Sequence, residues 1–345
     1  MPGEFLRPYV IAEIGVNHEG SLDRAKRLIE QVAHAGGNAA KFQTYKADKL
    51  AAKHTSPAYW DLSQEPTPSQ HELFQRFDSF GSSEYEALAK HCADFGIDFM
   101  STPFDLEAVD LLTPLMPLTK IASADLTNIP LLRKVARSGN AVVLSVGAGN
   151  HDEIERALEE LRNHGAQQIT LLHCVLNYPT PRKHAQLGQI KVLQQRFGSQ
   201  VAIGYSDHVP PEPDGSLPAL IQATLFGAVV LEKHFTDDKT AVGNDHYHAM
   251  NAEDLKRFLA ELEIHRELHG AGQLDLAIQQ SAITNARRRI IAARDLSAGD
   301  TITEQDLIAL RSNRGIEIFN WDEVVGRKIA RPVASDHPID WEDLV

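Results

Sequence analysis

Three ionisable residues stand side by side at the end of an apolar run. The run Val-Val-Leu-Glu-Lys-His-Phe covers residues 229–235 and is typical of a buried strand. Residues two apart in a strand share a face, so Glu232 and His234 point together while Lys233 points away, towards a helix layer or the rim. Buried ionisable groups are costly unless they are paired or bind something. The end of this strand is therefore a candidate site.

Two histidines end neighbouring predicted strands and are candidates to share a divalent metal. His208 ends the run Tyr-Ser-Asp-His, and His234 ends the run described above. Imidazole suits borderline metals such as manganese, iron or zinc, and Glu13 offers a further oxygen at another strand end. The spacing leaves open that both histidines form only ordinary hydrogen bonds at strand ends.

Lysines and hydroxyls gather at other strand ends. Lys41 and Gln43 share a face of the run 39–45, and Lys120 lies in the run 118–125. Such lysines could form a Schiff base or bind a phosphate or carboxylate, unless their heads only reach solvent at the rim. The small and hydroxyl residues nearby suit a bound phosphate; they are Ser101, Thr102, Ser123, Ser145, Gly147, Ala148 and Gly149.

The loop after the last predicted strand is rich in polar side chains. Two interpretations remain open: the loop contacts a polar substrate, or it is solvated and leads into a helix with Asn251 as its N-cap. Its candidate residues are Asp238, Asp245, His246 and His248.

Eight short β-rich runs carry most of these residues. They cover residues 9–15, 39–45, 98–104, 118–125, 141–147, 168–175, 201–208 and 228–235. Helical patterns lie between them; in the first, Ser21 is the expected N-cap and Gly36 the stop. This alternation predicts an α/β fold, a (β/α)8 TIM barrel. A doubly wound sheet is the alternative, but no Gly-x-Gly-x-x-Gly follows the first run.

The barrel explains why so many runs end in polar side chains. In barrel enzymes the carboxyl ends of the strands surround the active site. Ser145 and Ser206 are two further strand-end hydroxyls that we expect to bind substrate.

The chain organisation predicts a barrel with a small appendage. We expect the barrel over residues 1–270, a linker over 271–285 and a compact, mainly β domain over 286–345. The long connection at 46–80 is expected to be functional or disordered.

Composition excludes several classes of partner. A net charge of −13 opposes nucleic-acid binding, and no apolar stretch is long enough to span a membrane. The two cysteines form no disulfide framework, and the start lacks a signal-peptide pattern. We expect a soluble, cytoplasmic protein with neither nucleic-acid nor membrane partners.

The motifs, taken in order, resemble the sialic acid (N-acetylneuraminate) synthases. The matching blocks are "IAEIGVNHEGSLDRAKRLI", "AAKFQTY", "STPFD", "KIASADLTNIPLL", "LLHCVLNYPTP", "GYSDH" and "LEKHFT". The tail, with "ARDLSAGDTITEQDLIALR" and "VVGRKIARPV", is similar to the antifreeze-like (SAF) domain of that family. The resemblance runs from about residue 8 to the end.

The resemblance implies a C–C bond-forming transferase. Its substrates would be phosphoenolpyruvate and N-acetylmannosamine or a related N-acetylated hexosamine, and its products a nine-carbon 2-keto acid and phosphate. It implies a divalent metal held by His208 and His234, with manganese expected and magnesium or cobalt as alternatives. It also implies a domain-swapped homodimer, in which Arg311 reaches the N-acetyl group of the sugar.

The resemblance also assigns roles to individual residues. It gives catalytic roles to Glu13, Lys41, Lys120, His208 and His234. The phosphoenolpyruvate-binding set is Lys41, Gln43, Thr102, Lys120 and Ser123. The positions near the sugar are Asp125, Tyr178, Glu232 and Asp245.

Four departures from the family pattern concern mainly the sugar side. The usual Ser-Thr-Gly-Met is here Ser-Val-Gly-Ala, and Leu176 stands where Ser or Asn is usual. The usual Gly-Pro-Asp-His followed by Lys and Ala-Ser is here "GNDHYHA", and Arg-Pro-Gly-Asn-Gly is here "RSNRG". Legionaminic- or pseudaminic-type synthases, a Schiff-base barrel lyase and a non-catalytic carbohydrate-binding relative therefore stay as alternatives.

Overall fold

Eight parallel strands form the sheet of the first of two units. The computed structural model describes residues 7–270 and 272–345, and the chain divides into Met1–Gly270 and Ala271–Val345. The strands are β1 Tyr9–Gly15, β2 Ala39–Thr44, β3 Asp98–Pro103, β4 Leu118–Ile121, β5 Ala141–Ser145, β6 Ile169–Cys174, β7 Ala202–Asp207 and β8 Val230–His234. Each lies within one of the eight predicted runs.

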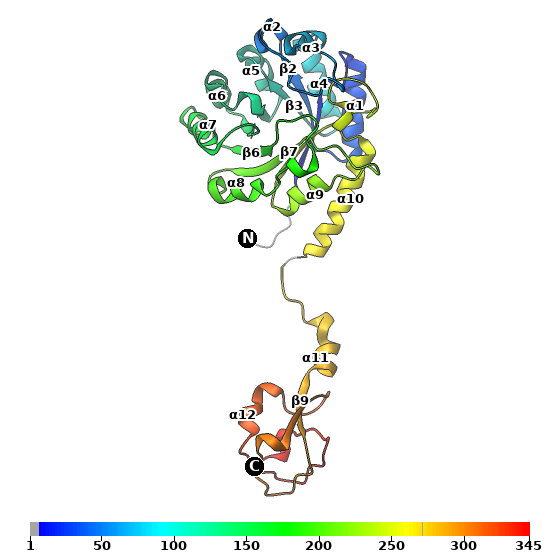
Figure 1. Cartoon of the computed structure of the whole chain (residues 1–345), viewed down its shortest axis with the longest axis vertical. Coiled ribbons are helices and arrows are strands. Elements are labelled where there is room, and N and C mark those ends of the chain that lie inside the picture. Colours follow the sequence, from blue (N-terminus) through cyan, green and yellow to red (C-terminus); the bar gives the residue numbers. More distant parts are fainter. Residues whose placement is uncertain (1–6, 271) are drawn as a thin grey trace. The chain divides into compact units, whose positions relative to one another are not determined.

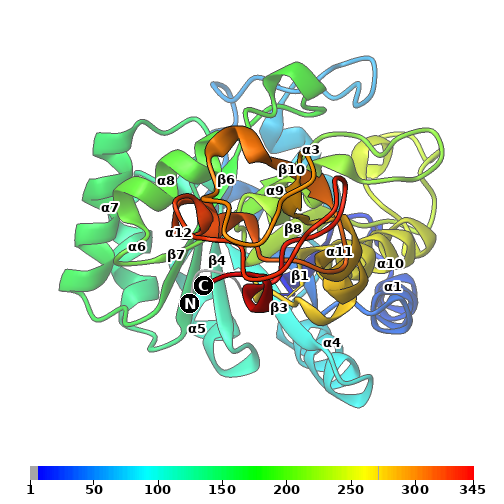
Figure 2. The same cartoon turned by 90° about the horizontal axis from the view of Figure 1, so that it is seen from below.

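The strand order closes the sheet into a nearly complete barrel. Neighbours pair in the order β3-β2-β1-β8-β7-β6-β5-β4, and β3 and β4 at the two ends also pack against each other. Figure 2 looks into this unit and shows helices ringing the strands. The predicted TIM barrel is confirmed, and the doubly wound sheet is wrong.

Helices alternate with the strands around the barrel (Figure 1). They are α1 Leu22–Ala35, α4 Ser82–Asp94, α5 Leu106–Leu112, α6 Ile129–Ala136, α7 His151–Asn163, α8 Gln189–Phe197, α9 Pro218–Leu225 and α10 Ala252–His269. Short 3-10 turns cover Thr113–Leu115, Ser123–Asp125, Arg182–His184 and His246–His248. Ser21 caps α1 by accepting a hydrogen bond from the Arg24 backbone N–H, and Gly36 ends it at φ 90°, as predicted.

Two apolar layers hold the strands. Side chains between the strands and the helices form the main core, which includes Leu28, Leu88 and Phe258. A small cluster fills the barrel interior below the strand ends; it consists of Ile11, Ala39, Met100, Val143 and Leu172. Each of the larger side chains in these layers contributes roughly 1.5–3 kcal/mol by leaving water. This interior cluster supports the strand ends above it, so that they can hold the side chains of a site in place.

The connection at 46–80 carries its own elements. It contains α2 Ala47–Leu50 and α3 Gln70–Phe77. Trp60 donates its indole N–H to the backbone carbonyl of Glu65 at 3.1 Å, and Glu65 accepts from Thr67. These contacts hold the connection in an ordered conformation.

The second unit is small and mainly irregular or β. It contains α11 Gln280–Ala286, β9 Arg288–Ala292, β10 Leu307–Arg311 and α12 Trp321–Val324, with 3-10 turns at Ala277–Gln279, Glu304–Asp306, Ile318–Asn320 and Trp341–Asp343. β9 and β10 pair antiparallel over a core of its own, which includes Ile290, Ile302 and Ile339. Across residues 7–270 and 272–345, every helix is too short or too polar to cross a membrane.

Candidate active site at the strand ends

One pocket opens at the carboxyl ends of the barrel strands. Its lining includes thirteen of the fifteen predicted site residues: Glu13, Lys41, Gln43, Thr102, Lys120, Ser123, Ser145, Tyr178, Ser206, His208, Glu232, His234 and Asp245. They come from strands far apart in sequence, and only the closure of the barrel brings them together.

Strand register sets the order of the reactive groups. Glu13 on β1 lies opposite Lys41 on β2 and opposite His234 on β8, and Ser206 on β7 lies opposite Glu232. Register partners in a parallel sheet point to the same face. A row of charged and imidazole side chains therefore crosses the sheet at the pocket floor.

Two lysines and two carboxylates form the centre of that row. Lys41 pairs with Glu13, donates to Thr102 Oγ1 at 2.8 Å and lies 3.6 Å from Glu232. Lys120 lies 3.4 Å from Glu232 on the other side. All four charged residues of this inner cluster are buried, so their interactions are stronger than on the surface.

The proton affinities of these groups follow from burial and neighbours. Burial raises the pKa of Glu13 to about 7, against the opposing effect of Lys41. Burial works against the charge of Glu232, but Lys120 and Lys41 bring its pKa below the usual range. Burial also lowers the pKa of Lys120, although Glu232 opposes the shift. Glu13 can therefore gain or lose a proton near neutrality while Glu232 stays charged.

Some buried oxygens in the pocket have no partner. Among the described residues, Ser145 Oγ and Glu232 Oε2 form no hydrogen bond. Gly147 donates its backbone N–H to Ser123 Oγ at 2.9 Å, and a Cβ at Gly147 would meet that oxygen at the same distance. Unpaired buried polar atoms in a pocket suit a polar ligand.

The predicted histidine pair lies at one side of the pocket. The rings of His208 and His234 have centroids 5.5 Å apart. His208 Nδ1 lies 2.9 Å from the carbonyl oxygen of Val175, so Nδ1 carries the proton and Nε2 offers a lone pair. Such an outer hydrogen bond is typical of metal-binding histidines.

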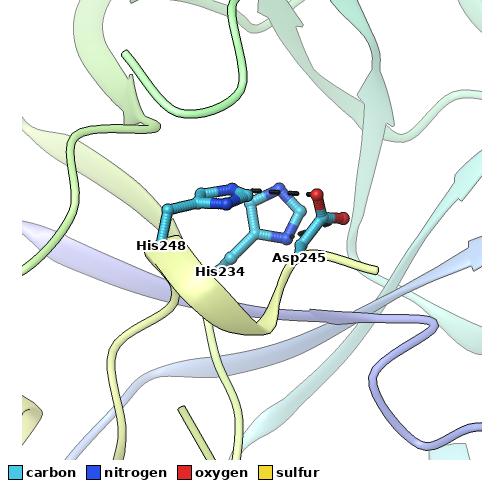
Figure 3. A group of neighbouring side chains, drawn as sticks. All are labelled: His234, Asp245 and His248. Atoms are coloured by element: carbon cyan, nitrogen blue, oxygen red, sulfur yellow. Dashed lines mark ion pairs between the residues drawn. The ribbon is translucent and has the colours of Figure 1, made fainter. Parts of the chain in front are cut away.

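A second histidine from the loop after β8 joins this group. Figure 3 shows His234, Asp245 and His248 pointing towards one another. One donor atom from each lies within 4.8 Å of the others. His208 is outside that donor group, although its ring lies 5.8 Å from the ring of His248.

These side chains fit a divalent metal. Among the described residues, His234 Nδ1 and both ring nitrogens of His248 form no hydrogen bond. Burial, followed by the neighbouring histidines, holds the pKa of both imidazoles well below the usual range. Neutral imidazole is the form that binds metals, and the Asp245 carboxylate 3.4 Å from His234 supplies negative charge.

Two predicted residues lie outside the pocket lining. Asp125 is half-buried and accepts a hydrogen bond from Asn128 at 2.8 Å. Arg311 ends β10 in the second unit, where its side chain is exposed. Their proposed contacts with the sugar remain predictions.

The burial of the loop after β8 tests its two sequence-based interpretations. Asn251 caps α10, as expected. Asp238 is exposed, in agreement with the solvated-loop interpretation, but His246 and His248 are completely buried, so that interpretation is wrong for the second half of the loop. No periodic pattern predicts this burial, because it arises where the loop folds back onto the strand end.

Several pocket residues carried no signal of their own in the sequence. Tyr59, Trp60 and Phe74 come from the long connection, and Tyr247 comes from the loop after β8. The ring of Tyr59 lies edge-on to that of Tyr178, with centroids 6.2 Å apart. The length of the connection was the available hint, because long ordered loops are usually functional.

Comparisons with known proteins agree with this geometry. The family model of the NeuB family matches residues 28–273, and that of the SAF domain matches residues 287–345. The N,N'-diacetyllegionaminic acid synthase of Campylobacter jejuni is 34% identical over 335 residues, which cover 96% of this chain and 98% of that protein.

Two further relatives support the same assignment. The N-acetylneuraminate-9-phosphate synthase of Drosophila melanogaster is 32% identical over 364 residues, covering 96% of this chain and 94% of that protein. The solved N-acetylneuraminic acid (sialic acid) synthetase of Leptospira borgpetersenii superposes with a TM-score of 0.69 at 32% identity, covering 80% of this chain and 90% of that one. The chain therefore belongs to the NeuB family and ends in a SAF domain.

Proposed function

We propose that this chain is a nonulosonic acid synthase. It condenses phosphoenolpyruvate with N-acetylmannosamine or a related N-acetylated hexosamine, giving a nine-carbon 2-keto sugar acid and phosphate. The observation that carries the proposal is the placement of two buried lysines on either side of Glu232, beside a histidine group, in one strand-end pocket.

The lysines would bind the anionic substrate. Phosphoenolpyruvate carries a carboxylate and a phosphate, and Lys41 and Lys120 each present an ammonium group in a poorly solvated pocket. Charge pairs there are stronger than in water. The unpaired Ser145 hydroxyl and the Thr102 hydroxyl add hydrogen-bonding capacity.

His208 and His234 would hold a divalent metal, with manganese as the first candidate and magnesium or cobalt as alternatives. Such a metal supplies Lewis acidity that polarises the sugar aldehyde and makes water a better nucleophile. Tyr178, whose ring lies 4.1 Å from that of His208, would orient the sugar next to these histidines.

The condensation forms a C–C bond between the two substrates and releases phosphate from phosphoenolpyruvate. C3 of phosphoenolpyruvate forms a bond to the aldehyde carbon of the sugar, and the aldehyde oxygen becomes a hydroxyl. A water oxygen adds to C2, and the tetrahedral intermediate loses phosphate by cleavage of the C2–O bond. Glu13 orients the incoming water, and Glu232, held by the Ser206 hydroxyl at 2.9 Å, faces the sugar.

The part of the pocket proposed to face the acceptor sugar favours a second candidate substrate, a legionaminic-type amino sugar. Leu176, Tyr59, Trp60 and Tyr247 give this side of the pocket an apolar character. Apolar walls bind an acceptor that carries fewer hydroxyls more favourably than they bind a fully hydroxylated one. The Campylobacter relative named above is an N,N'-diacetyllegionaminic acid synthase.

The test is phosphate release from phosphoenolpyruvate with manganese. The full-length protein would be assayed with N-acetylmannosamine and with a panel of diamino-dideoxy hexoses, each with and without EDTA. We expect chelator-sensitive release with one sugar. Activity that is trapped by borohydride would indicate a Schiff-base lyase instead. Binding of phosphoenolpyruvate without turnover of any sugar would indicate a non-catalytic relative.

A further inference from the structure

We propose that His248 is a third imidazole ligand of the metal, together with His208, His234 and the Asp245 carboxylate. This inference rests on the metal site in the proposed function and goes beyond the histidine pair that the family resemblance implies. It assigns a role to one of the departures in the loop after β8.

The first support is the burial of His248. The residue ends the 3-10 turn His246–His248 in the loop after β8, and its side chain is completely buried. A buried imidazole needs a polar partner.

The second support is that no such partner is provided by hydrogen bonding. Within residues 7–270 and 272–345, neither Nδ1 nor Nε2 of His248 forms a hydrogen bond. The nearest acidic oxygen is Asp245 Oδ1, 3.8 Å from Nε2, which is beyond hydrogen-bond range (Figure 3). Buried polar atoms without partners are rare in native proteins and point to an ion or ligand.

The third support is the spacing of the three rings. A metal about 2.1 Å from each imidazole nitrogen lies roughly 3 Å from each ring centre, so rings that share it lie about 4.5–6 Å apart. The centroid of the His234 ring is 4.9 Å from that of His248, and His208 closes the triangle at 5.5 and 5.8 Å. All three sides fall in that interval, and the donor atoms of His234, Asp245 and His248 already lie within 4.8 Å of one another, whereas His208 lies outside that donor group.

The loop is fixed so that His248 stays in place. Met250 donates its backbone N–H to the carbonyl of His234 at 2.8 Å, and Thr236 donates to the carbonyl of Met250 at 3.0 Å. The backbone N–H of Asp245 donates to Asn17 Oδ1 at 3.3 Å. These bonds tie both ends of the loop to β8 and to the β1 connection, so His248 is positioned before any ligand binds.

The chemical consequence is a change in metal preference. Each added imidazole favours borderline ions, and affinity rises from manganese through iron to cobalt and nickel. We expect this chain to bind cobalt and iron(II) better, relative to manganese, than a site with two histidines does.

Proton NMR of the cobalt(II)-loaded, full-length protein tests the proposal directly. Each cobalt-bound histidine gives one strongly shifted, exchangeable ring N–H signal. We expect three such signals in the wild type and two in His248→Ala, which removes the imidazole. The cobalt dissociation constant, measured by calorimetry, should rise ten- to a hundredfold in that variant, and the manganese constant should rise less.

His173→Gln is the matched control. His173 is a buried strand-end histidine on β6 whose Nε2 lies 2.8 Å from the Ala185 carbonyl oxygen, and it is not in the histidine group. This variant should keep three signals and wild-type cobalt affinity. Thermal unfolding of each metal-free protein checks that folding is unchanged.

The outcomes separate this inference from the proposed function. Two shifted signals in the wild type, with metal-dependent phosphate release intact, would overturn the role of His248 alone. Failure of the wild type to bind cobalt or manganese at all would overturn both this inference and the metal in the proposed mechanism.

Discussion

The same two strands carry two buried ion-pair clusters, one on each face. On the inner face, Glu232 of β8 accepts from Ser206 of β7 and lies between two lysines. On the outer face, the next residue of each strand forms the pair Lys233–Asp207 at 2.7 Å. The two clusters are one residue apart in sequence and equally buried.

The two clusters differ in how many of their polar atoms form hydrogen bonds. Asp207 accepts from the Tyr205 hydroxyl at 2.8 Å and the Val209 backbone N–H at 2.9 Å, as well as from Lys233. Glu232 keeps an oxygen that accepts no hydrogen bond from the described residues. A saturated cluster stabilises the fold, whereas an unsaturated one in a pocket is suited to a ligand. Lys233 points away from the pocket, as its strand position predicted.

The largest expected effect comes from removing an inner-face imidazole. His234→Ala should lower kcat at least a thousandfold, because it removes a proposed metal ligand, while the thermal unfolding temperature changes by only a few degrees. Steady-state phosphate release and calorimetric unfolding measure the two quantities. Full activity in His234→Ala would show that the inner face does not hold the metal.

Replacing one buried lysine on each face separates ligand binding from folding stability. Lys233→Met leaves Asp207 buried without its cation, which should cost about 3–5 kcal/mol in the free energy of unfolding. Lys41→Met should cost a similar amount and also abolish calorimetric binding of phosphoenolpyruvate. Urea unfolding at one pH gives both stabilities. If Lys233→Met lost phosphoenolpyruvate binding while remaining folded, the division into two faces would be wrong.

The inner cluster should also make stability depend on pH. The folded state raises the pKa of Glu13 from 4.5 to about 7, so it binds a proton more tightly than the unfolded chain does. Its contribution is fully present below pH 4.5 and is lost as the pH rises through 7, on the order of 3 kcal/mol. Glu13→Gln should remove that part of the slope. Identical slopes in urea titrations of both proteins would contradict the shift.

The smallest expected effect lies in the second unit. Arg311→Ala should raise the KM for the sugar about tenfold with little change in the KM for phosphoenolpyruvate, as expected for a lost sugar contact. The neighbouring Arg314→Ala is the control and should leave both constants unchanged. Equal changes for the two substrates would argue against a sugar contact by Arg311.

How far the sequence predicts this site depends on which part of the fold carries each residue. Strand alternation was enough to find Glu13, Lys41, His208 and His234, because a period of two fixes which side chains face inwards. The barrel was predictable for a different reason, because eight β-rich runs alternate with helical patterns along the chain. Closure of the barrel then brings the inward-facing side chains at the carboxyl ends of all strands together.

Residues on loops could not be placed in this way. His248 and Tyr247 follow no period, and their burial depends on hydrogen bonds between residues 236–251 and the end of β8. The same holds for Tyr59 and Trp60, whose position depends on the folding of the connection 46–80. Long-range contacts of this kind are not encoded in local composition.

The division of the pocket between strands and loops has a consequence for how such enzymes diversify. The groups proposed to bind phosphoenolpyruvate lie on strands whose register couples them to the whole barrel, so a substitution there disturbs many neighbours at once. Much of the proposed acceptor wall comes from the connection 46–80, which carries none of the proposed metal ligands and can change with little penalty elsewhere. A lineage can therefore inherit the chemistry unchanged and acquire a new sugar through a handful of loop substitutions.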